Sequence, residues 1–229
     1  MAVELTGPGM VGLLLLLGTV VSLDGTSVGQ VMISRPIVAG PLAGWIAGSP
    51  EAGLAAGFVL ELLYLPVLPV GGGRFPEVGA GAVAGGAAAA VAQGPGGLAA
   101  GVLLGIAVGA LGGRSIRWLR TLNGRLAPDP ADPELGPGNV RRAHHMTLAL
   151  DAVRGAAVTS VGIAGALLLA PRVAPHWPLG SGATVGLVLA GCGFTLGLLL
   201  ATLAGTRLAR LAFLGVGALG GILLATWLG

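Results

Sequence analysis

The sequence predicts an all-α integral membrane protein with several spans, some of them short, broken or re-entrant helices. Of the 229 residues, 54% are hydrophobic and only 9% are charged, whereas a soluble domain carries about 25% charged residues. The mean hydropathy is +0.91. The 44 glycines and 15 prolines fit membrane helices that approach one another closely and are interrupted. We expect a single membrane-embedded domain over residues 1–229.

Apolar runs along the chain predict the helices. The first lacks a basic segment before it and follows Glu4, so we expect a retained membrane segment and not a cleaved signal peptide. A straight span needs about 20 residues, and several of the runs are that long. The runs cover residues 7–23, 37–48, 52–70, 78–93, 96–113, 152–170, 183–204 and 211–228.

Two of these runs are too short to cross a bilayer. The second lies between Pro36 and Pro50 and would reach about 18 Å as a helix, against a hydrocarbon core of about 30 Å. It predicts a half-helix or one arm of a re-entrant hairpin. The fourth run, residues 78–93, consists almost wholly of small residues, and we expect it to be re-entrant too.

An internal echo suggests a repeat. The segment GLAAGFVLEL at residues 53–62 is similar to GLAAGVLLGI at residues 97–106, and each follows a proline closely. Transporters are often built from repeats with broken helices around a shared site. Chance similarity is the alternative in a chain so rich in glycine and alanine.

The arginines predict the topology. The polar stretch at residues 114–145 contains a cluster of arginines, and the positive-inside rule makes it a cytoplasmic loop. The loop with Arg172 and His176 is then outside, and Arg207 and Arg210 are inside. Because aromatic residues are few and the arginines gather at the ends of apolar runs, the basic charge indicates membrane topology and not nucleic-acid binding.

Glu61 is an ionisable residue inside the third apolar run. A carboxylate at the centre of a bilayer costs about 2.5–3.5 kcal/mol on insertion scales, so it needs a partner, a polar cavity or a ligand. One interpretation is a structural ion pair with Arg35. The other is a ligand or proton site, and sugars suit a carboxylate because neighbouring hydroxyls can donate to its two oxygens.

A polar hinge separates the first two runs. It contains Asp24, Gln30, Ser34 and Arg35. It is either an interfacial loop or unwound backbone that lines a polar cavity, next to the N-terminus of a half-helix that begins at Pro36.

The remaining polar residues suggest supporting roles. Glu77 follows a glycine-rich turn and could face the same cavity, whereas Asp151 and Arg154 have the i, i+3 spacing of an ion pair at a helix start near the cytoplasmic face. The three histidines lack metal-ligand spacing, the single Cys192 fits a packing role, and no intramembrane protease motif occurs. We therefore expect no enzyme, metal or cofactor.

Residues 23–77 resemble the IIC component of the mannose–fructose–sorbose family of the bacterial sugar phosphotransferase system. The resemblance rests on LDGTSVGQVMI followed by SRPIVAGPLAGWIAGSPEAGLAAGFVLELLYL, with a weaker match in LALDAVRGAA at residues 148–157. The family pattern is an acidic residue and Gln after the first helix, an RPLV-like step, a glycine turn and an L-E-hydrophobic run. Ser49 stands where relatives often have Asp, and the spacing from Asp24 to Gln30 also departs from the pattern.

The resemblance implies a transport subunit in the bacterial cytoplasmic membrane. Such a IIC component forms oligomers with a IID membrane subunit and carries a hexose, which a soluble IIB protein, supplied through IIA, phosphorylates at the inner face. The alternatives are a carrier subunit outside that system and a non-transporting scaffold or regulator. The expected substrate-binding residues are Glu61, Gln30, Asp24 and Arg35, with further polar contacts from Glu77, Asp151 and Arg154.

Overall fold

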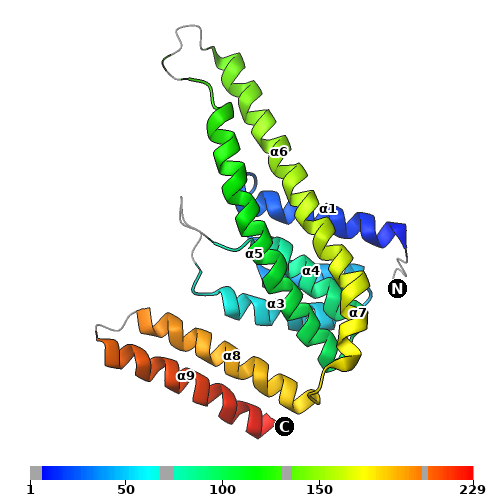
Figure 1. Ribbon diagram of the computed structural model, residues 1–229, viewed down its shortest axis with the longest axis vertical. Coiled ribbons are helices and arrows are strands. Elements are labelled where there is room, and N and C mark those ends of the chain that lie inside the picture. Colours follow the sequence, from blue (N-terminus) through cyan, green and yellow to red (C-terminus); the bar gives the residue numbers. More distant parts are fainter. Residues whose placement is uncertain (1–6, 68–74, 130, 132–135, 203–205, 229) are drawn as a thin grey trace.

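A computed structural model describes residues 7–67, 75–129, 131, 136–202 and 206–228. These residues form helices and connections with no strand (Figure 1), which confirms the all-α prediction. The elements are α1 (Pro8–Thr26), α2 (Pro36–Ile46), α3 (Pro50–Tyr64), α4 (Val78–Ala92), α5 (Gly94–Leu126), α6 (Pro137–Ala164), a π-helical turn (Gly165–Leu169), α7 (Ala170–Val173), a 3₁₀ turn (Ala174–His176), α8 (Ser181–Thr202) and α9 (Arg207–Leu228).

Among the described residues, 4 helices are long and apolar enough to cross a membrane: Pro8–Thr26, Gly94–Leu126, Pro137–His176 and Ser181–Ala201. The second and fourth predicted runs form the short helices α2, of 11 residues, and α4, of 15 residues. The prediction of short helices is therefore confirmed. α3 also has 15 residues, because it ends at Tyr64, before Pro66.

Helices α2 and α3 form a tight antiparallel hairpin built on glycines. A Cβ atom on Gly40 would lie 2.7 Å from the carbonyl oxygen of Gly53 and 2.7 Å from Cα of Gly57. A Cβ atom on Gly44 would likewise lie 2.6 Å from Cα of Gly53. The two backbones approach this closely only because neither helix carries side chains along the contact.

Helices α4 and α5 form a second hairpin of the same kind. Gly85 of α4 lies against Gly101 of α5, and Gly81 lies against Gly105. The two similar segments of the sequence, residues 53–62 and 97–106, lie in α3 and α5. Each of these helices is the second helix of its hairpin. The sequence echo therefore corresponds to equivalent positions in two hairpins.

Helix α4 is the centre of the molecule. It packs against α1, α2, α3, α5 and α6, and its residues from Gly79 to Ala90 are all buried. Small side chains let five helices approach one axis, and Leu60 from α3 fills the space beside Gly85 and Gly105. The core is thus a helix of glycine and alanine that larger residues surround.

The predicted cytoplasmic loop at residues 114–145 is wrong in its extent. α5 continues through these arginines to Leu126 and α6 begins at Pro137, so the connection covers only residues 127–136. No proline interrupts α5 after Pro95, whereas Pro128 follows its end. With 33 residues, α5 is about 50 Å long at 1.5 Å per residue, and with α6 it extends well beyond the other helices (Figure 1).

The C-terminal helices form a third hairpin. α8 and α9 lie side by side (Figure 1), and α8 packs on α3 and α5. The chain reaches α8 through the π-helical turn at Gly165–Leu169, which precedes Pro171. Because Pro171 has no backbone N–H to donate, a local change in helix type is expected there. Cys192 of α8 is a buried free thiol, which fits the predicted packing role.

Candidate functional site

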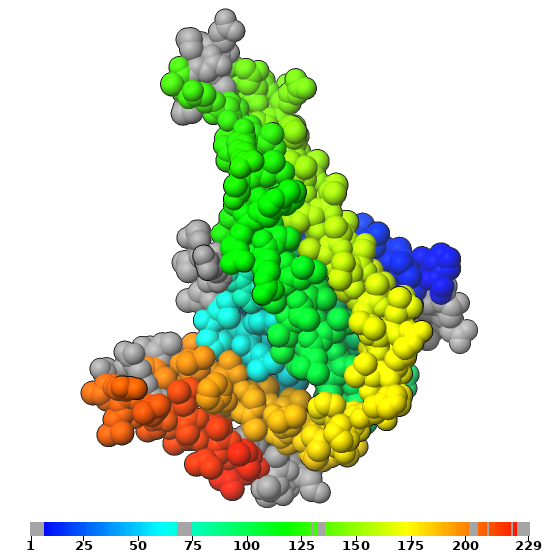
Figure 2. All heavy atoms as spheres, viewed as in Figure 1, coloured from blue at the N-terminus to red at the C-terminus, as the bar shows by residue number. Residues whose placement is uncertain are grey.

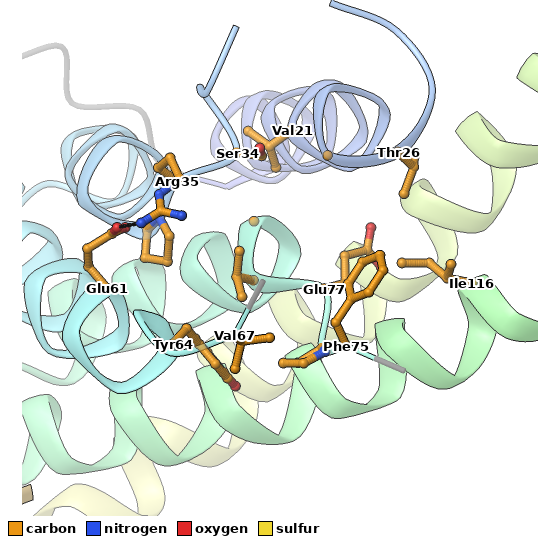
Figure 3. A pocket seen from close by; sticks show the side chains of 15 residues that line it. Val21, Thr26, Ser34, Arg35, Glu61, Tyr64, Val67, Phe75, Glu77 and Ile116 are labelled. Carbon is orange, nitrogen blue, oxygen red and sulfur yellow. Dashed lines mark hydrogen bonds and ion pairs between the residues drawn. The ribbon is translucent and has the colours of Figure 1, made fainter. Parts of the chain in front are cut away.

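A cavity of about 100 Å³ lies where α1, α2, α3, α4 and α5 meet. It is closed on one side by the hairpin of α2 and α3 and on the other by the start of α4. Figure 3 shows Arg35 and Glu61 at one end of this inner cavity, with Glu77 and Thr26 towards the other. The remaining lining includes Val21, Gly25, Ser34, Pro36, Tyr64, Val67, Phe75, Pro76, Val78, Gly79 and Ile116.

Glu61 and Arg35 form an ion pair at this cavity, through Oε1 of Glu61 and a terminal nitrogen of Arg35. Oε2 of Glu61 accepts a 3.3 Å hydrogen bond from the backbone N–H of Ile37. Because α2 begins at Pro36, the carboxylate sits at the positive end of a helix, which stabilises negative charge. The side chains are 14% exposed for Glu61 and 39% for Arg35. Glu61 is therefore both paired, as one interpretation predicted, and part of a cavity wall, as the other requires.

Asp24 is buried at the end of α1 and organises the hinge that follows. Its Oδ1 accepts the N–H of Val31 at 2.7 Å and its Oδ2 accepts the N–H of Ser34 at 2.9 Å. Both carboxylate oxygens of Asp24 therefore accept backbone hydrogen bonds. These bonds hold the polar segment that leads to Arg35 in place. Asp24 lines the outer cavity described below, but its geometry indicates a role in positioning the hinge.

Replacing Asp24 by Asn is expected to loosen the hinge. One of the two acceptor atoms becomes an NH₂ group, which cannot accept a backbone N–H. Because hydrogen bonds to charged groups contribute about 1.5–3 kcal/mol, we expect a loss of stability of that order and faster proteolysis within residues 27–35. Equal proteolysis of the wild type and the variant would contradict this role. Asp129→Asn, in an exposed connection, is the control.

A second, outer cavity adjoins the first. Its volume is about 470 Å³, and the two share Gly25, Thr26, Ser34, Arg35, Phe75 and Ile116. Gln30, which has a φ of 53°, lines the outer cavity together with Asn123 of α5. The Oδ1 atom of Asn123 is buried without a hydrogen-bond partner among the described residues. The expected substrate-binding residues thus divide between two adjoining spaces: Glu61 lines the inner cavity, Asp24 and Gln30 the outer, and Arg35 both.

A buried charge cluster forms the far wall of the inner cavity. Arg154 of α6 makes a bidentate pair with Glu77, through 2.6 Å and 2.9 Å hydrogen bonds, and its Nε donates to Asp151 at 2.9 Å. The side chains of Arg154 and Glu77 are each 5% exposed. Ser115 of α5 receives a further hydrogen bond from Arg154 at 3.0 Å. The predicted ion pair between Asp151 and Arg154 is confirmed, but the prediction that it lies at a helix start is wrong, because α6 begins at Pro137 and the pair lies in its middle.

The same cluster ties α6 to α1. Oδ2 of Asp151 accepts the hydroxyls of Thr26 and Ser27, so α1, α4, α5 and α6 all meet at one guanidinium and two carboxylates. The pairing of Glu77 with Arg154 was not foreseen from the sequence, because the two residues are 77 positions apart and lack any local spacing signal. Within the described residues no group of three or more His, Cys, Asp or Glu side chains could hold a metal ion.

Comparison with known proteins identifies the family. The family model described as the sorbose-specific IIC component of the phosphotransferase system matches residues 10–215. The chain belongs to this IIC family. As a IIC component with apolar helices of spanning length, it is a multi-pass membrane protein.

One curated protein and one solved structure are also similar to the chain. Over 59 residues the IIC chain is 36% identical to an Escherichia coli (strain K12) protein named "Putative N-acetylgalactosamine permease IIC component 2". That match covers 26% of this chain and 44% of the relative, so it spans less than half the relative's length. A solved structure titled "Structure of membrane protein" shares the fold, with a TM-score of 0.67 at 17% identity, over 98% of this chain and 96% of the other.

Proposed function

We propose that this IIC component binds a hexose in the two adjoining cavities and carries it across the bacterial cytoplasmic membrane. As a member of the IIC family it is a transport subunit. The observation that carries the proposal is a carboxylate, Glu61, held at the N-terminus of a short helix and lining a cavity inside an otherwise apolar molecule. A group that is costly in a membrane is expected to serve substrate recognition.

Glu61 has acceptor capacity left for a sugar. An ionised carboxylate offers about four lone-pair sites, and the protein donors on it are Arg35 and the N–H of Ile37. Two neighbouring hydroxyls of a sugar ring can therefore donate to the remaining sites, in charge-assisted hydrogen bonds that are stronger than neutral ones. Arg35 orients the carboxylate through their ion pair.

The volumes suggest how the sugar lies. The inner cavity, of about 100 Å³, is much the smaller of the two. A hexose would therefore reach Glu61 with one edge and extend past Arg35 into the outer cavity of about 470 Å³. There the amide groups of Gln30 and Asn123 can exchange hydrogen bonds with its other hydroxyls.

The proposal includes partners that follow from the family. A IID membrane subunit completes the transport complex, and the soluble IIA and IIB proteins pass a phosphoryl group to the sugar at the inner face. The sugar is a hexose or an N-acetylated hexosamine, since one relative's name refers to N-acetylgalactosamine.

Sugar binding by Glu61→Gln tests the proposal. The protein, purified with its IID partner, is titrated with mannose, fructose, sorbose, glucosamine and N-acetylgalactosamine. We expect saturable binding of at least one sugar by the wild type, weakened roughly 10- to 100-fold in the variant, because charge-assisted hydrogen bonds are lost. Glu51→Gln makes the same chemical change at an exposed position in the first turn of α3 and should leave binding unchanged.

Thermal stability separates recognition from a purely structural role. If Glu61 only pairs with Arg35, then Glu61→Gln and Arg35→Gln should both lower the melting temperature and leave sugar affinity intact. Normal binding by Glu61→Gln would rule out the proposed role of this carboxylate. No binding of any sugar by the folded wild-type complex would rule out the proposed substrate class.

A further inference from the structure

A third cavity lies at the surface, between the end of α3, the segment that leads into α4, and α5. We call it the lateral cavity. Its volume is about 380 Å³, which is in the range of small-molecule sites. Figure 2 shows α5 (green) at the surface beside α3 (cyan), with no other helix across its middle turns. Among the described residues, the lining includes Tyr64, Phe75, Ile106, Ala110, Arg114 and Arg117, with no Asp or Glu.

One face of α5 runs through the lateral cavity and changes there from apolar to basic. Ile106, Ala110, Arg114 and Arg117 follow one another at spacings of three or four residues, which places them on one side of the helix. Ile106 is 39% exposed, and both arginines are exposed. The lateral cavity therefore has an apolar end and an end with two positive charges.

The two arginines have no partner within the described part of the chain. The side chains of Arg114 and Arg117 make no ion pair or hydrogen bond there. The carboxylate of Glu77, at the start of α4, is taken by Arg154. Asp129 follows the end of α5, which lies about 14 Å along the helix from Arg117. The positive end of the cavity is therefore free to receive an anion from outside the chain.

Tyr64 adds a third donor to the same space. Its hydroxyl lies against α5, where a Cβ atom on Gly109 would be 3.1 Å from it, and Figure 3 shows the side chain reaching toward that helix. Within the described residues this hydroxyl makes no hydrogen bond. Helical side chains lean toward the N-terminus of their helix, so Arg114 leans toward the turn that contains Gly109 and the Tyr64 hydroxyl.

Phe75 forms a fixed wall of the lateral cavity. Its carbonyl oxygen lies so close to Gly113 of α5 that a Cβ atom on this glycine would overlap it. The guanidinium of Arg120 lies over the ring, 5.2 Å from its centroid. Both the backbone and the ring of Phe75 are therefore held against α5, and the cavity is preformed, as ligand sites usually are.

We infer that the lateral cavity binds one anionic phospholipid. Its phosphate accepts hydrogen bonds from Arg114, Arg117 and Tyr64, and its acyl chain lies along Ile106 and Ala110. Guanidinium groups suit phosphate oxygens because they form bidentate, charge-assisted hydrogen bonds, and basic pockets between membrane helices bind anionic headgroups. This binding is independent of whether the other two cavities hold a sugar.

The surroundings of the cavity favour a lipid over free phosphate or an acidic protein. α5 is long and apolar enough to span a membrane. Leu103, 60% exposed, continues the apolar end of the cavity along the helix, and Trp118, 68% exposed, follows the arginines. Exposed tryptophans are typical of the headgroup level. A headgroup with its chain attached matches both ends of the cavity, whereas a phosphate ion or an acidic side chain matches only the basic end.

Native mass spectrometry of the full-length chain tests the inference by counting bound lipid. The protein, in a neutral detergent, is titrated with phosphatidylglycerol, with phosphatidylcholine or with inorganic phosphate. We expect the wild type to retain one phosphatidylglycerol with at least about tenfold higher affinity than phosphatidylcholine, because each nearby arginine favours an anionic headgroup about fivefold. Inorganic phosphate at the same concentration should neither be retained nor displace the lipid.

Three variants locate the bound lipid. Arg114→Gln together with Arg117→Gln should weaken phosphatidylglycerol binding at least about tenfold, and Tyr64→Phe should weaken it about fivefold, because only one hydrogen bond is lost. Arg141→Gln together with Arg142→Gln removes two exposed charges from α6. This matched control should bind the lipid as the wild type does. Without added lipid, both double variants should melt as the wild type does, because these arginines have no partner within the described residues.

Four results would overturn the inference. Equal retention of phosphatidylglycerol by the wild type and the Arg114 and Arg117 double variant would exclude the lateral cavity as its site. Equal loss by the control would indicate a general attraction of anionic lipid to a basic protein. Displacement of the lipid by inorganic phosphate would make this a phosphate site. Displacement by an added IID subunit would assign the cavity to a protein. None of these measurements involves a sugar, so their failure leaves the proposed function untouched.

Discussion

Replacing Arg154 by Met is expected to destabilise the protein more than any other single change to its polar residues. The variant leaves the carboxylates of Glu77 and Asp151 buried without their cation. Removing one partner of a buried ion pair typically costs about 3–5 kcal/mol, and here two carboxylates lose the same partner. We expect the free energy of unfolding, measured by denaturant titration in mild detergent, to fall by about that amount.

A double-mutant cycle attributes the loss to the cluster. Adding Glu77→Gln to Arg154→Met removes one of the stranded charges, so the double variant should be more stable than the sum of the single effects predicts. Arg117→Met, at an exposed position of α5, is the control and should change stability little. If Arg154→Met lowers the free energy of unfolding by less than about 1 kcal/mol, the ion pairs of Arg154 contribute no more than exposed salt bridges do. That result would contradict the prediction that the cluster is buried.

Gly53→Ala is expected to open the hairpin of α2 and α3. The added methyl group would lie 2.5 Å from the carbonyl oxygen of Gly40 and 2.6 Å from Cα of Gly44. Both are backbone atoms, which cannot rotate away, so α2 must move. Overpacking of this kind costs about 1–3 kcal/mol. Because α2 carries the N–H group that holds Glu61, we expect sugar affinity to fall together with the thermal stability.

Gly12→Ala is the matched control, because a Cβ atom there would have no neighbour within 4 Å. Alanine is favoured over glycine inside helices by about 0.5–1 kcal/mol, so this variant should be as stable as the wild type or slightly more stable. Both substitutions add the same methyl group, but Gly53→Ala should lower the free energy of unfolding and Gly12→Ala should leave it unchanged or raise it slightly. Equal effects on stability would show that α2 and α3 are not in close contact at Gly53.

Much of the fold could be predicted because lipid imposes simple rules. Apolar runs of spanning length must form helices, since unpaired backbone groups are too costly in a bilayer. Prolines at positions 36, 50 and 66 delimit α2 and α3. The same rules misjudged residues 114–145, where polar composition suggested a loop and the helices continue, because charged residues such as arginine are good helix formers in water.

The candidate site could be predicted only in part. Glu61, Arg35 and Asp24 stand out as ionisable residues next to apolar runs, and the cost of burying charge draws attention to each of them. Which atoms they meet is a matter of packing. Asp24 uses its two oxygens on the backbone of the hinge, and Glu77, at the edge of the inner cavity, pairs with Arg154. Neither arrangement has a signature in local spacing.

Composition and local order are enough to predict a helical membrane protein, the points where its helices break and the IIC motif. Three features required the packed structure: α4 is the central helix between the hairpin of α2 and α3 and its own partner α5, one arginine joins four helices, and Glu61 faces a cavity. These features depend on contacts between residues far apart in the chain. Such contacts form only where small residues let helices meet and the resulting burial of charge can be offset by pairing.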